Sequence, residues 1–167
     1  MNPKLAAIEP SLIRALAAKK KPTSIDLGLG EPALLPQQRF LDAALRQSAE
    51  LGMKYTVNAG DEGLRTLIAR RYAYPAMDAA RNVCVMNGSE EAMFVAIKTL
   101  LDAERNEVLV VEPAYPAYAK IAQLEGIRVR AAALSASDGF RYDAQRILAT
   151  VTPATRLIII GSPANPP

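Results

Sequence analysis

Residues 107–118 read EVLVVEPAYPAY, and this stretch decides the fold. It contains four consecutive apolar residues, 108–111, and ends in residues 113–118 (PAYPAY), which include two prolines and two tyrosines. A short run that is apolar throughout, with no polar alternation, is typical of a strand that is covered on both faces. We therefore predict a buried strand at 108–111, followed by a turn and a helix.

Comparable apolar runs flank this stretch at 83–86, 127–133 and 157–160. Segments with helical spacing of apolar residues separate them, at 90–101, 116–125 and 143–150. Strands that alternate with helices at this spacing predict a mostly parallel sheet. The predicted fold class is α/β, with a predominantly parallel sheet sandwiched by helices.

The part of the chain before residue 83 has a different pattern. Residues 1–21 are predicted to form an arm with a helical stretch, and residues 25–35 an extended segment that is punctuated by Gly and Pro. Helices are predicted at 37–51 and 62–73, where apolar residues recur at helical spacing. On the first of these helices, Phe40, Leu41, Ala44, Leu45 and Ser48 share one face, which is mostly apolar.

Composition excludes several classes of function. The 167 residues include no histidine and one cysteine, Cys84, so the chain holds no Ser-His-Asp or Cys-His catalytic set and we predict no metal site. The net charge is only +3 and aromatic residues are few, which argues against nucleic-acid binding. No segment reaches the roughly 18 apolar residues of a membrane span. We expect a cytoplasmic protein.

Residues at the ends of the predicted strands are the candidates for a site. Asn87-Gly88-Ser89 closes one strand and opens a helix. Gly88 lets a ligand approach the backbone, Ser89 is predicted to cap the helix, and the N–H groups of Ser89 and Glu90 would attract an anion. Glu90 and Glu91 place negative charge there, and acids in a first turn are also typical of a plain helix. On residue types alone, a simply capped helix is the better explanation.

Two further side chains follow predicted strands. Tyr115 lies between Pro113 and Pro116, where its ring could lie flat on an aromatic ligand or pack against the next helix. Asn165 precedes a proline, where its amide could donate to a ring oxygen or serve a turn. The residues themselves leave both alternatives open.

Five motifs follow one another along the chain: 27–32 (LGLGEP), Tyr55-Thr56 with Gly60 and Leu64-Arg65, 87–92 (NGSEEA), 107–118 (EVLVVEPAYPAY) and 162–166 (SPANP). Each motif alone is weak, but in this order and at this spacing they resemble the class I/II aminotransferases, which are fold-type I pyridoxal-phosphate enzymes. The resemblance covers essentially the whole chain and reverses the local preference for a plain helix.

The resemblance implies pyridoxal 5′-phosphate as the cofactor and gives a role to each strand-end residue. Gly88, Ser89 and Glu90 would form a phosphate cup through their backbone amides. Tyr115 would stack on the pyridine ring, and Asn165 would hydrogen-bond the oxygen of the ring's 3-hydroxyl group.

The resemblance also implies partners and an organisation. Gly30 would lie near the substrate carboxylate, and Tyr55 would reach across a homodimer interface to the cofactor phosphate of the partner subunit. The substrates would be an amino acid and a 2-oxo acid. Residues 1–35 would be an N-terminal arm and entrance segment, and 36–167 the N-terminal part of the cofactor-binding large domain.

Family members continue beyond the region that this chain resembles, and their later part supplies the lysine that holds the cofactor. No catalytic residue is therefore assigned here, and we expect the chain alone to be inactive and prone to aggregate, because strand 83–86 would lack its neighbour. A β-lyase or decarboxylase of the same superfamily, or a non-catalytic fragment, stays open as an alternative.

Overall fold

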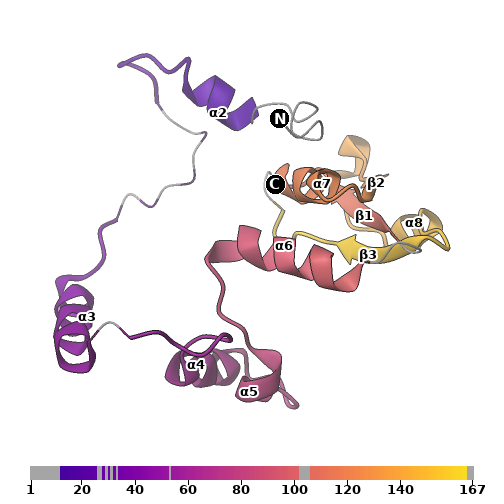
Figure 1. Ribbon diagram of the computed structural model, residues 1–167. Helices are drawn as coiled ribbons and strands as arrows, with labels where there is room; N and C mark the ends of the chain where they lie inside the picture. The colour runs from indigo at the N-terminus through magenta and orange to yellow at the C-terminus, as the bar shows by residue number, and fades with distance from the viewer. Residues whose placement is uncertain are drawn as a thin grey trace. The chain divides into compact units, whose positions relative to one another are not determined.

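The computed structural model describes residues 12–25, 28, 30, 32, 34–52, 54–101 and 106–164. Its contacts divide the chain into two compact units, built mainly on Asn87–Pro167 and on Ile13–Met86 (Figure 1). The predicted division into 1–35 and 36–167 is a different one and stays a prediction. Each unit is described by itself.

The Asn87–Pro167 unit is built on a parallel sheet with the strand order β2-β1-β3. Its strands are β1 (Glu107–Glu112), β2 (Arg128–Ala133) and β3 (Thr155–Ile159). The central strand, β1, pairs in parallel with both neighbours, with Val110 opposite Ala131 on one side and Ile159 on the other. The predictions of strands at 108–111, 127–133 and 157–160 and of a parallel sheet are confirmed.

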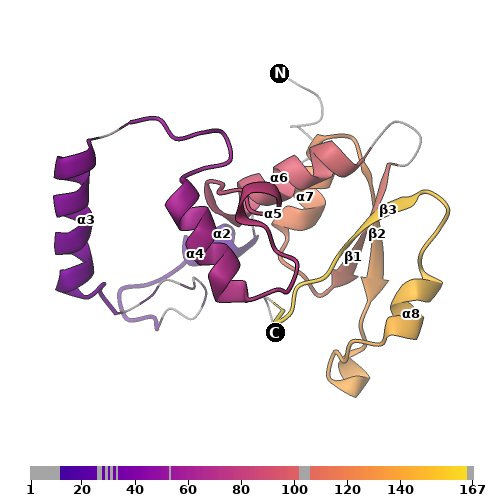
Figure 2. The ribbon, with the colours of Figure 1, turned by 90° about the horizontal axis from the view of Figure 1, so that it is seen from below.

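Helices cover both faces of this sheet (Figure 2). On one face lie α6 (Gly88–Leu100) and α7 (Ala117–Leu124), and on the other lies α8 (Ala144–Ala149), which follows a short 3₁₀ turn, η1 (Ala136–Asp138). The predicted helices at 90–101, 116–125 and 143–150 are confirmed within two residues, and so is the predicted α/β sandwich.

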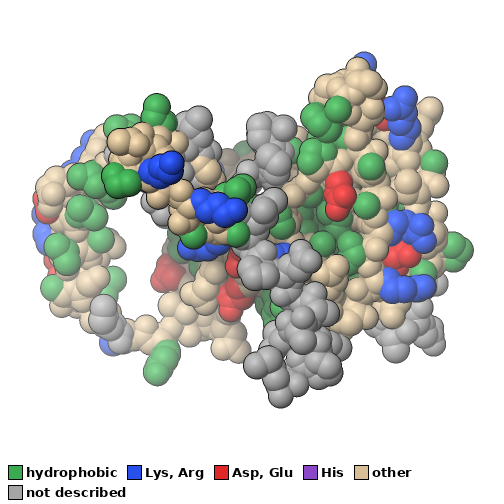
Figure 3. Space-filling view, turned by 90° about the horizontal axis from the view of Figure 1, so that it is seen from above, with side chains coloured by type: hydrophobic (Ala, Val, Ile, Leu, Met, Phe, Trp, Pro, Cys, Tyr) green, Lys and Arg blue, Asp and Glu red, His purple; other side chains and the backbone are tan. Residues whose placement is uncertain are grey.

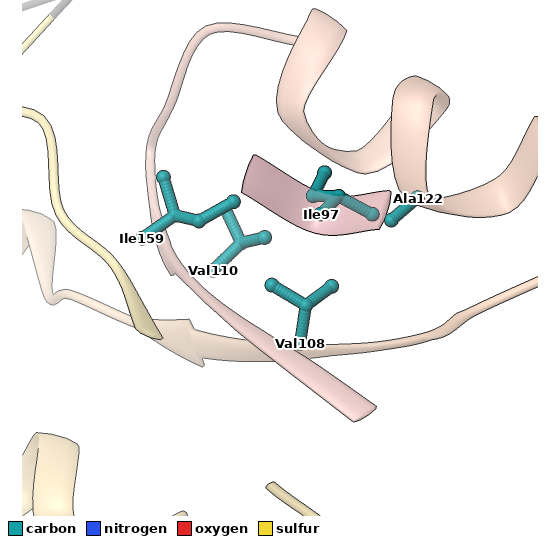
Figure 4. Packing of buried hydrophobic residues seen from close by; sticks show 5 residues of the cluster. All are labelled: Ile97, Val108, Val110, Ala122 and Ile159. Carbon is teal, nitrogen blue, oxygen red and sulfur yellow. The ribbon is translucent and has the colours of Figure 1, made fainter. Parts of the chain in front are cut away.

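Successive side chains of β1 point to opposite faces of the sheet, and each face has its own core. The core beneath α6 and α7 consists of Ile97, Val108, Val110, Ala122 and Ile159 (Figure 4). The core beneath α8 consists of Leu109, Val111, Ala132 and Ile147. Burial on both faces explains why residues 108–111 are apolar without alternation.

Glu107, the first residue of β1, is a buried carboxylate with three donors. Its Oε1 accepts hydrogen bonds from Arg130 Nε at 3.1 Å, Thr152 Oγ1 at 2.8 Å and Thr155 Oγ1 at 2.7 Å. These bonds, that of Arg130 foremost, stabilise the ionised form and lower the pKa of Glu107 to about 2. The cluster ties β1 to both neighbouring strands at the end of the sheet where the strands begin.

The described residues before Asn87 form helices joined by extended segments. These helices are α2 (Leu12–Ala17), α3 (Gln38–Leu51), α4 (Glu62–Tyr72) and α5 (Ala79–Asn82). The predictions of helices at 37–51 and 62–73 are confirmed. Asp61 caps α4, because its side chain accepts a hydrogen bond from the Leu64 N–H at 2.8 Å.

The predicted apolar face of α3 is present but uncovered. None of its residues is buried, and Phe40 and Leu45 are 59% and 69% exposed. Hydrophobic side chains also lie among charged ones on the surface seen in Figure 3. None of the helices in the described ranges is both long and apolar enough to cross a membrane.

Arg65, from the Leu64-Arg65 motif, is a buried side chain of α4. Its Nη1 donates to the carbonyl oxygens of Ala79 and Ala80 at 3.4 and 3.3 Å. Arg65 thereby joins α4 to α5.

The prediction of a strand at 83–86 is wrong for the structure described. Val83 is buried and has the extended dihedral angles φ −121° and ψ 124°, but the segment belongs to no strand ladder among the described residues. The Val85 N–H donates instead to the carbonyl of Ala59 at 3.0 Å. An apolar run becomes a strand only where a neighbouring strand completes the ladder, and the run alone does not specify that neighbour.

Gly60 packs against this extended segment and offers a test of it. Its φ is +94°, and a Cβ added there would lie 2.7 Å from Val85 Cβ. Gly60→Ala is expected to destabilise the fold by about 2 kcal/mol, through backbone strain and overpacking. Denaturant unfolding measures this loss.

The control is Gly52, which has a φ of +68° and nothing within 4 Å of an added Cβ. Gly52→Ala should impose only the backbone strain, about 1 kcal/mol. Equal losses at the two positions would contradict the close packing of Gly60 on Val85.

Candidate functional site

Two elements of the Asn87–Pro167 unit meet at the end of the sheet where the strands finish. Helix α6 begins at Gly88, and the turn after β1 carries Tyr115. The Tyr115 hydroxyl donates to Oε1 of Glu90, in the first turn of α6, at 2.7 Å. In parallel α/β sheets, ligands bind outside the carboxyl ends of the strands, so this edge is the candidate site.

The first turn of α6 presents backbone donors to open space. The N–H groups of Gly88, Ser89 and Glu90 precede the first intrahelical hydrogen bond, so the helix itself gives them no acceptor. Gly88 has a φ of +79°, and a Cβ added to it would have nothing within 4 Å. Three amides, the positive end of the helix dipole and open space above a glycine are what an anion such as phosphate requires.

The N-terminal cap differs from the prediction. The N-cap residue is Asn87, without a side-chain capping bond, and Ser89 is the second residue of the helix. The prediction that Ser89 caps α6 is therefore wrong. Both Asn and Ser are cap residues by type, and the chain enters the helix through Gly88, whose φ of +79° is readily adopted only by glycine.

The carboxylate of Glu91 is hydrogen-bonded at the N-terminus of α6. Its Oε2 accepts hydrogen bonds from the backbone N–H of Asn87 and from Asn87 Nδ2, the latter at 3.0 Å. A carboxylate that reaches back to the N-cap residue resembles the reciprocal bonding of a capping box. Glu91 therefore stabilises the start of α6, which is the plain-helix role considered for it.

The ring of Tyr115 is held at two places. Its hydroxyl is bonded to Glu90, and its ring meets that of Tyr118 edge to face, with centroids 5.7 Å apart and an interplanar angle of 82°. Tyr115 is half-buried and contacts the first turn of α6 through the carboxylate of Glu90. An aromatic ring next to an anion site suits a ligand that carries both a phosphate and a flat ring.

The segment after β3 reaches the same edge of the sheet. The Tyr142 hydroxyl donates to the carbonyl of Gly161, and a Cβ added to Gly161 would lie 3.9 Å from the Tyr118 hydroxyl oxygen. Two tyrosines thus flank the segment that leads to Asn165. Asn165 itself lies outside the described residues, and its role stays a prediction.

Gly30 and Tyr55 belong to the Ile13–Met86 unit. Gly30 is exposed with nothing within 4 Å of an added Cβ, and the Tyr55 side chain is fully exposed. Their proposed contacts with substrate and with a partner subunit's cofactor stay predictions.

Sequence reasoning missed three features of this edge: the side chain of Glu90 as the partner of Tyr115, and the two neighbouring tyrosines, Tyr118 and Tyr142. The only local signal was the short separation of Tyr115 and Tyr118, which are three residues apart on either side of the start of α7. The bonds from Tyr115 and Tyr142 join residues 25 and 19 positions apart, so no sequence pattern reports them.

Comparison with known proteins gives one consistent answer. The family model "Aminotransferase class I and II" matches residues 22–167. Over 166 residues, the chain is 32% identical to the aspartate aminotransferase of Pyrococcus horikoshii. This alignment covers 95% of this chain and 41% of that protein. Over 156 residues, it is 31% identical to the arginine–pyruvate transaminase of Pseudomonas aeruginosa. This alignment covers 92% of this chain and 39% of that protein.

Solved structures give the same answer. Aspartate aminotransferase from Thermus thermophilus with maleate superposes with a TM-score of 0.85 at 25% identity, covering 99% of this chain and 45% of that one. The aromatic aminotransferase of Pyrococcus horikoshii gives a TM-score of 0.79 at 28% identity, covering 93% and 42%. The chain thus spans about two fifths of the length of the curated relatives it matches.

Proposed function

The chain belongs to the class I and II aminotransferases, and from this premise we propose that it supplies the phosphate cup and ring platform of a transaminase's cofactor site. Enzymes of this family depend on pyridoxal 5′-phosphate. The reaction would transfer an amino group between an amino acid and a 2-oxo acid.

One observation carries this proposal: the hydroxyl of Tyr115 is hydrogen-bonded to the side chain of Glu90, whose backbone amide is one of the donors at the start of α6. The N–H groups of Gly88, Ser89 and Glu90 would bind the phosphate, helped by the helix dipole. Tyr115 would cover one face of the pyridine ring. When bound, the cofactor supplies an electron sink for carbanion chemistry.

The two acids of the first turn fit this proposal, although a phosphate carries the same sign of charge. The carboxylate of Glu91 is bonded to Asn87, and that of Glu90 to Tyr115. Both side chains have partners other than the backbone amides of the cup. The amides therefore stay available to a phosphate.

The remaining assignments extend the proposal to the whole enzyme. Asn165 would hold the ring oxygen, Gly30 would lie near the substrate carboxylate, and Tyr55 would reach the cofactor phosphate of the partner subunit in a homodimer. The lysine that holds the cofactor is assigned to the part of the family's length that this chain does not span. A cytoplasmic location fits a chain with one cysteine, Cys84.

Binding of pyridoxamine 5′-phosphate to the chain tests this proposal. This probe carries an amine in place of the aldehyde, so it does not condense with surface lysines. Isothermal titration should show saturable binding at one site per chain, and removal of the phosphate, as in pyridoxamine, should weaken it by about tenfold or more. Equal binding of the two compounds, or none of either, would count against the phosphate cup.

A further inference from the structure

The side chain of Glu90 has a bond that the proposed phosphate cup does not use. A cup formed by backbone amides requires nothing of this carboxylate, and a negative charge there opposes a phosphate. Yet Glu90 Oε1 accepts the hydroxyl of Tyr115 at 2.7 Å, a length typical of an O–H···O hydrogen bond. The bond joins the first turn of α6 to the turn that follows β1.

We propose that Glu90 is a positioning residue, whose carboxylate fixes the ring of Tyr115 in the plane that the cofactor's ring would meet. This inference rests on the proposed function. Glu90 then has two roles: its backbone amide belongs to the phosphate cup, and its side chain orients the ring of Tyr115.

The geometry supports this because Tyr115 is restrained at two separate points. A tyrosine side chain has two rotatable torsions between the backbone and the ring. Glu90 holds the hydroxyl at the far end, and Tyr118 meets the ring from the side at an interplanar angle of 82°. Contacts at the tip and at the side together set both torsions.

A ring that is fixed before the ligand arrives lowers the ordering cost of binding. The phosphate cup and the ring platform are then held at a constant separation, because one residue belongs to both. Loss of the Glu90–Tyr115 bond should therefore weaken binding of a ligand that has both a phosphate and a ring. Loss of this bond should not weaken the binding of inorganic phosphate.

A double-mutant cycle tests this inference through the affinity for pyridoxamine 5′-phosphate. Glu90→Ala and Tyr115→Phe are each expected to weaken binding by about three- to tenfold, because both remove the same bond. The double variant should bind no more weakly than either single variant. Glu90→Gln should lie between Glu90→Ala and the unchanged chain, because its amide oxygen still accepts the hydroxyl.

The alternative is that Glu90 acts only through its charge on the phosphate. In that case Glu90→Gln and Glu90→Ala would bind equally well, both more tightly than the unchanged chain, and Tyr115→Phe would not alter their effect. Glu91→Gln is the matched control, since it removes a neighbouring charge that is bonded to Asn87. We expect it not to weaken binding of pyridoxamine 5′-phosphate.

A second measurement needs no ligand. In the chain with ¹³C-labelled tyrosine, the Cζ signal of Tyr115, identified by its loss in Tyr115→Phe, should move in Glu90→Ala and stay in place in Glu91→Gln. A Cζ signal that does not respond to Glu90→Ala overturns the inference. The inference is also overturned if Glu90→Ala binds pyridoxamine 5′-phosphate as tightly as the original chain does. Failure of the unchanged chain to bind overturns the proposed function and, with it, this role of Glu90.

Discussion

Gly88→Ala is expected to remove most of the affinity of the chain for pyridoxamine 5′-phosphate, by about thirtyfold or more, while the fold survives. The φ of Gly88 is +79°, so an alanine there imposes about 1 kcal/mol of backbone strain. An added Cβ meets no protein atom within 4 Å, so it causes no clash in the unliganded chain. The methyl group would instead occupy the space through which a phosphate oxygen reaches the amides.

Gly52→Ala is the matched control for that variant. Gly52, at the end of α3, has a similar φ of +68° and equally open surroundings. Both variants should lose comparable stability in denaturant unfolding, whereas only Gly88→Ala should lose affinity in titration. If Gly88→Ala bound the ligand as well as the unchanged chain, Gly88 would not be part of the cup.

Glu107→Ala is expected to cost the fold about 3 kcal/mol at neutral pH, since it removes a buried carboxylate that accepts three hydrogen bonds, one of them from the more exposed Arg130. It removes the acceptor of Arg130, Thr152 and Thr155 and leaves the two threonine hydroxyls without this partner. The control is Glu125→Ala, which breaks the more exposed pair with Lys98, 2.7 Å long, and should cost about 1 kcal/mol or less. Denaturant unfolding of both variants compares the two pairs.

The pH dependence of this loss has a definite sign. The pKa of Glu107 is lowered from 4.5 to about 2 in the folded chain, so the carboxylate stabilises the fold fully above pH 4.5. That contribution disappears as the pH falls through about 2, where the folded chain also takes up the proton. The difference in unfolding free energy between the unchanged chain and Glu107→Ala should therefore shrink between pH 4.5 and 2. A difference that stays constant over this range would contradict the ionised cluster.

Much of the fold could be predicted because the features concerned are local. The run 108–111 is buried on both faces, and its uninterrupted apolar character indicates a central strand. The run 83–86 has the same character, yet its Val85 N–H bonds to the turn at Ala59 and no strand forms among the described residues. Local composition indicates burial, whereas a strand also requires a partner that the run does not specify.

Part of the candidate site could also be predicted from the sequence. The amides of Gly88, Ser89 and Glu90 and the position of Tyr115 follow from where a strand ends and a helix begins. The bond between Tyr115 and Glu90 does not, because it depends on how α6 and the turn after β1 pack against each other. Side-chain contacts between elements far apart in sequence become visible only in the folded chain.

The central claim, that the first turn of α6 holds the phosphate of the cofactor, is tested most directly by amide NMR. Pyridoxamine 5′-phosphate is titrated into the ¹⁵N-labelled chain, and the shift of every backbone amide is followed. We predict that the largest shifts fall on Gly88, Ser89 and Glu90, and that pyridoxamine without the phosphate leaves these three amides nearly unmoved. Shifts concentrated elsewhere, with these three amides unaffected by the phosphate, would contradict the claim.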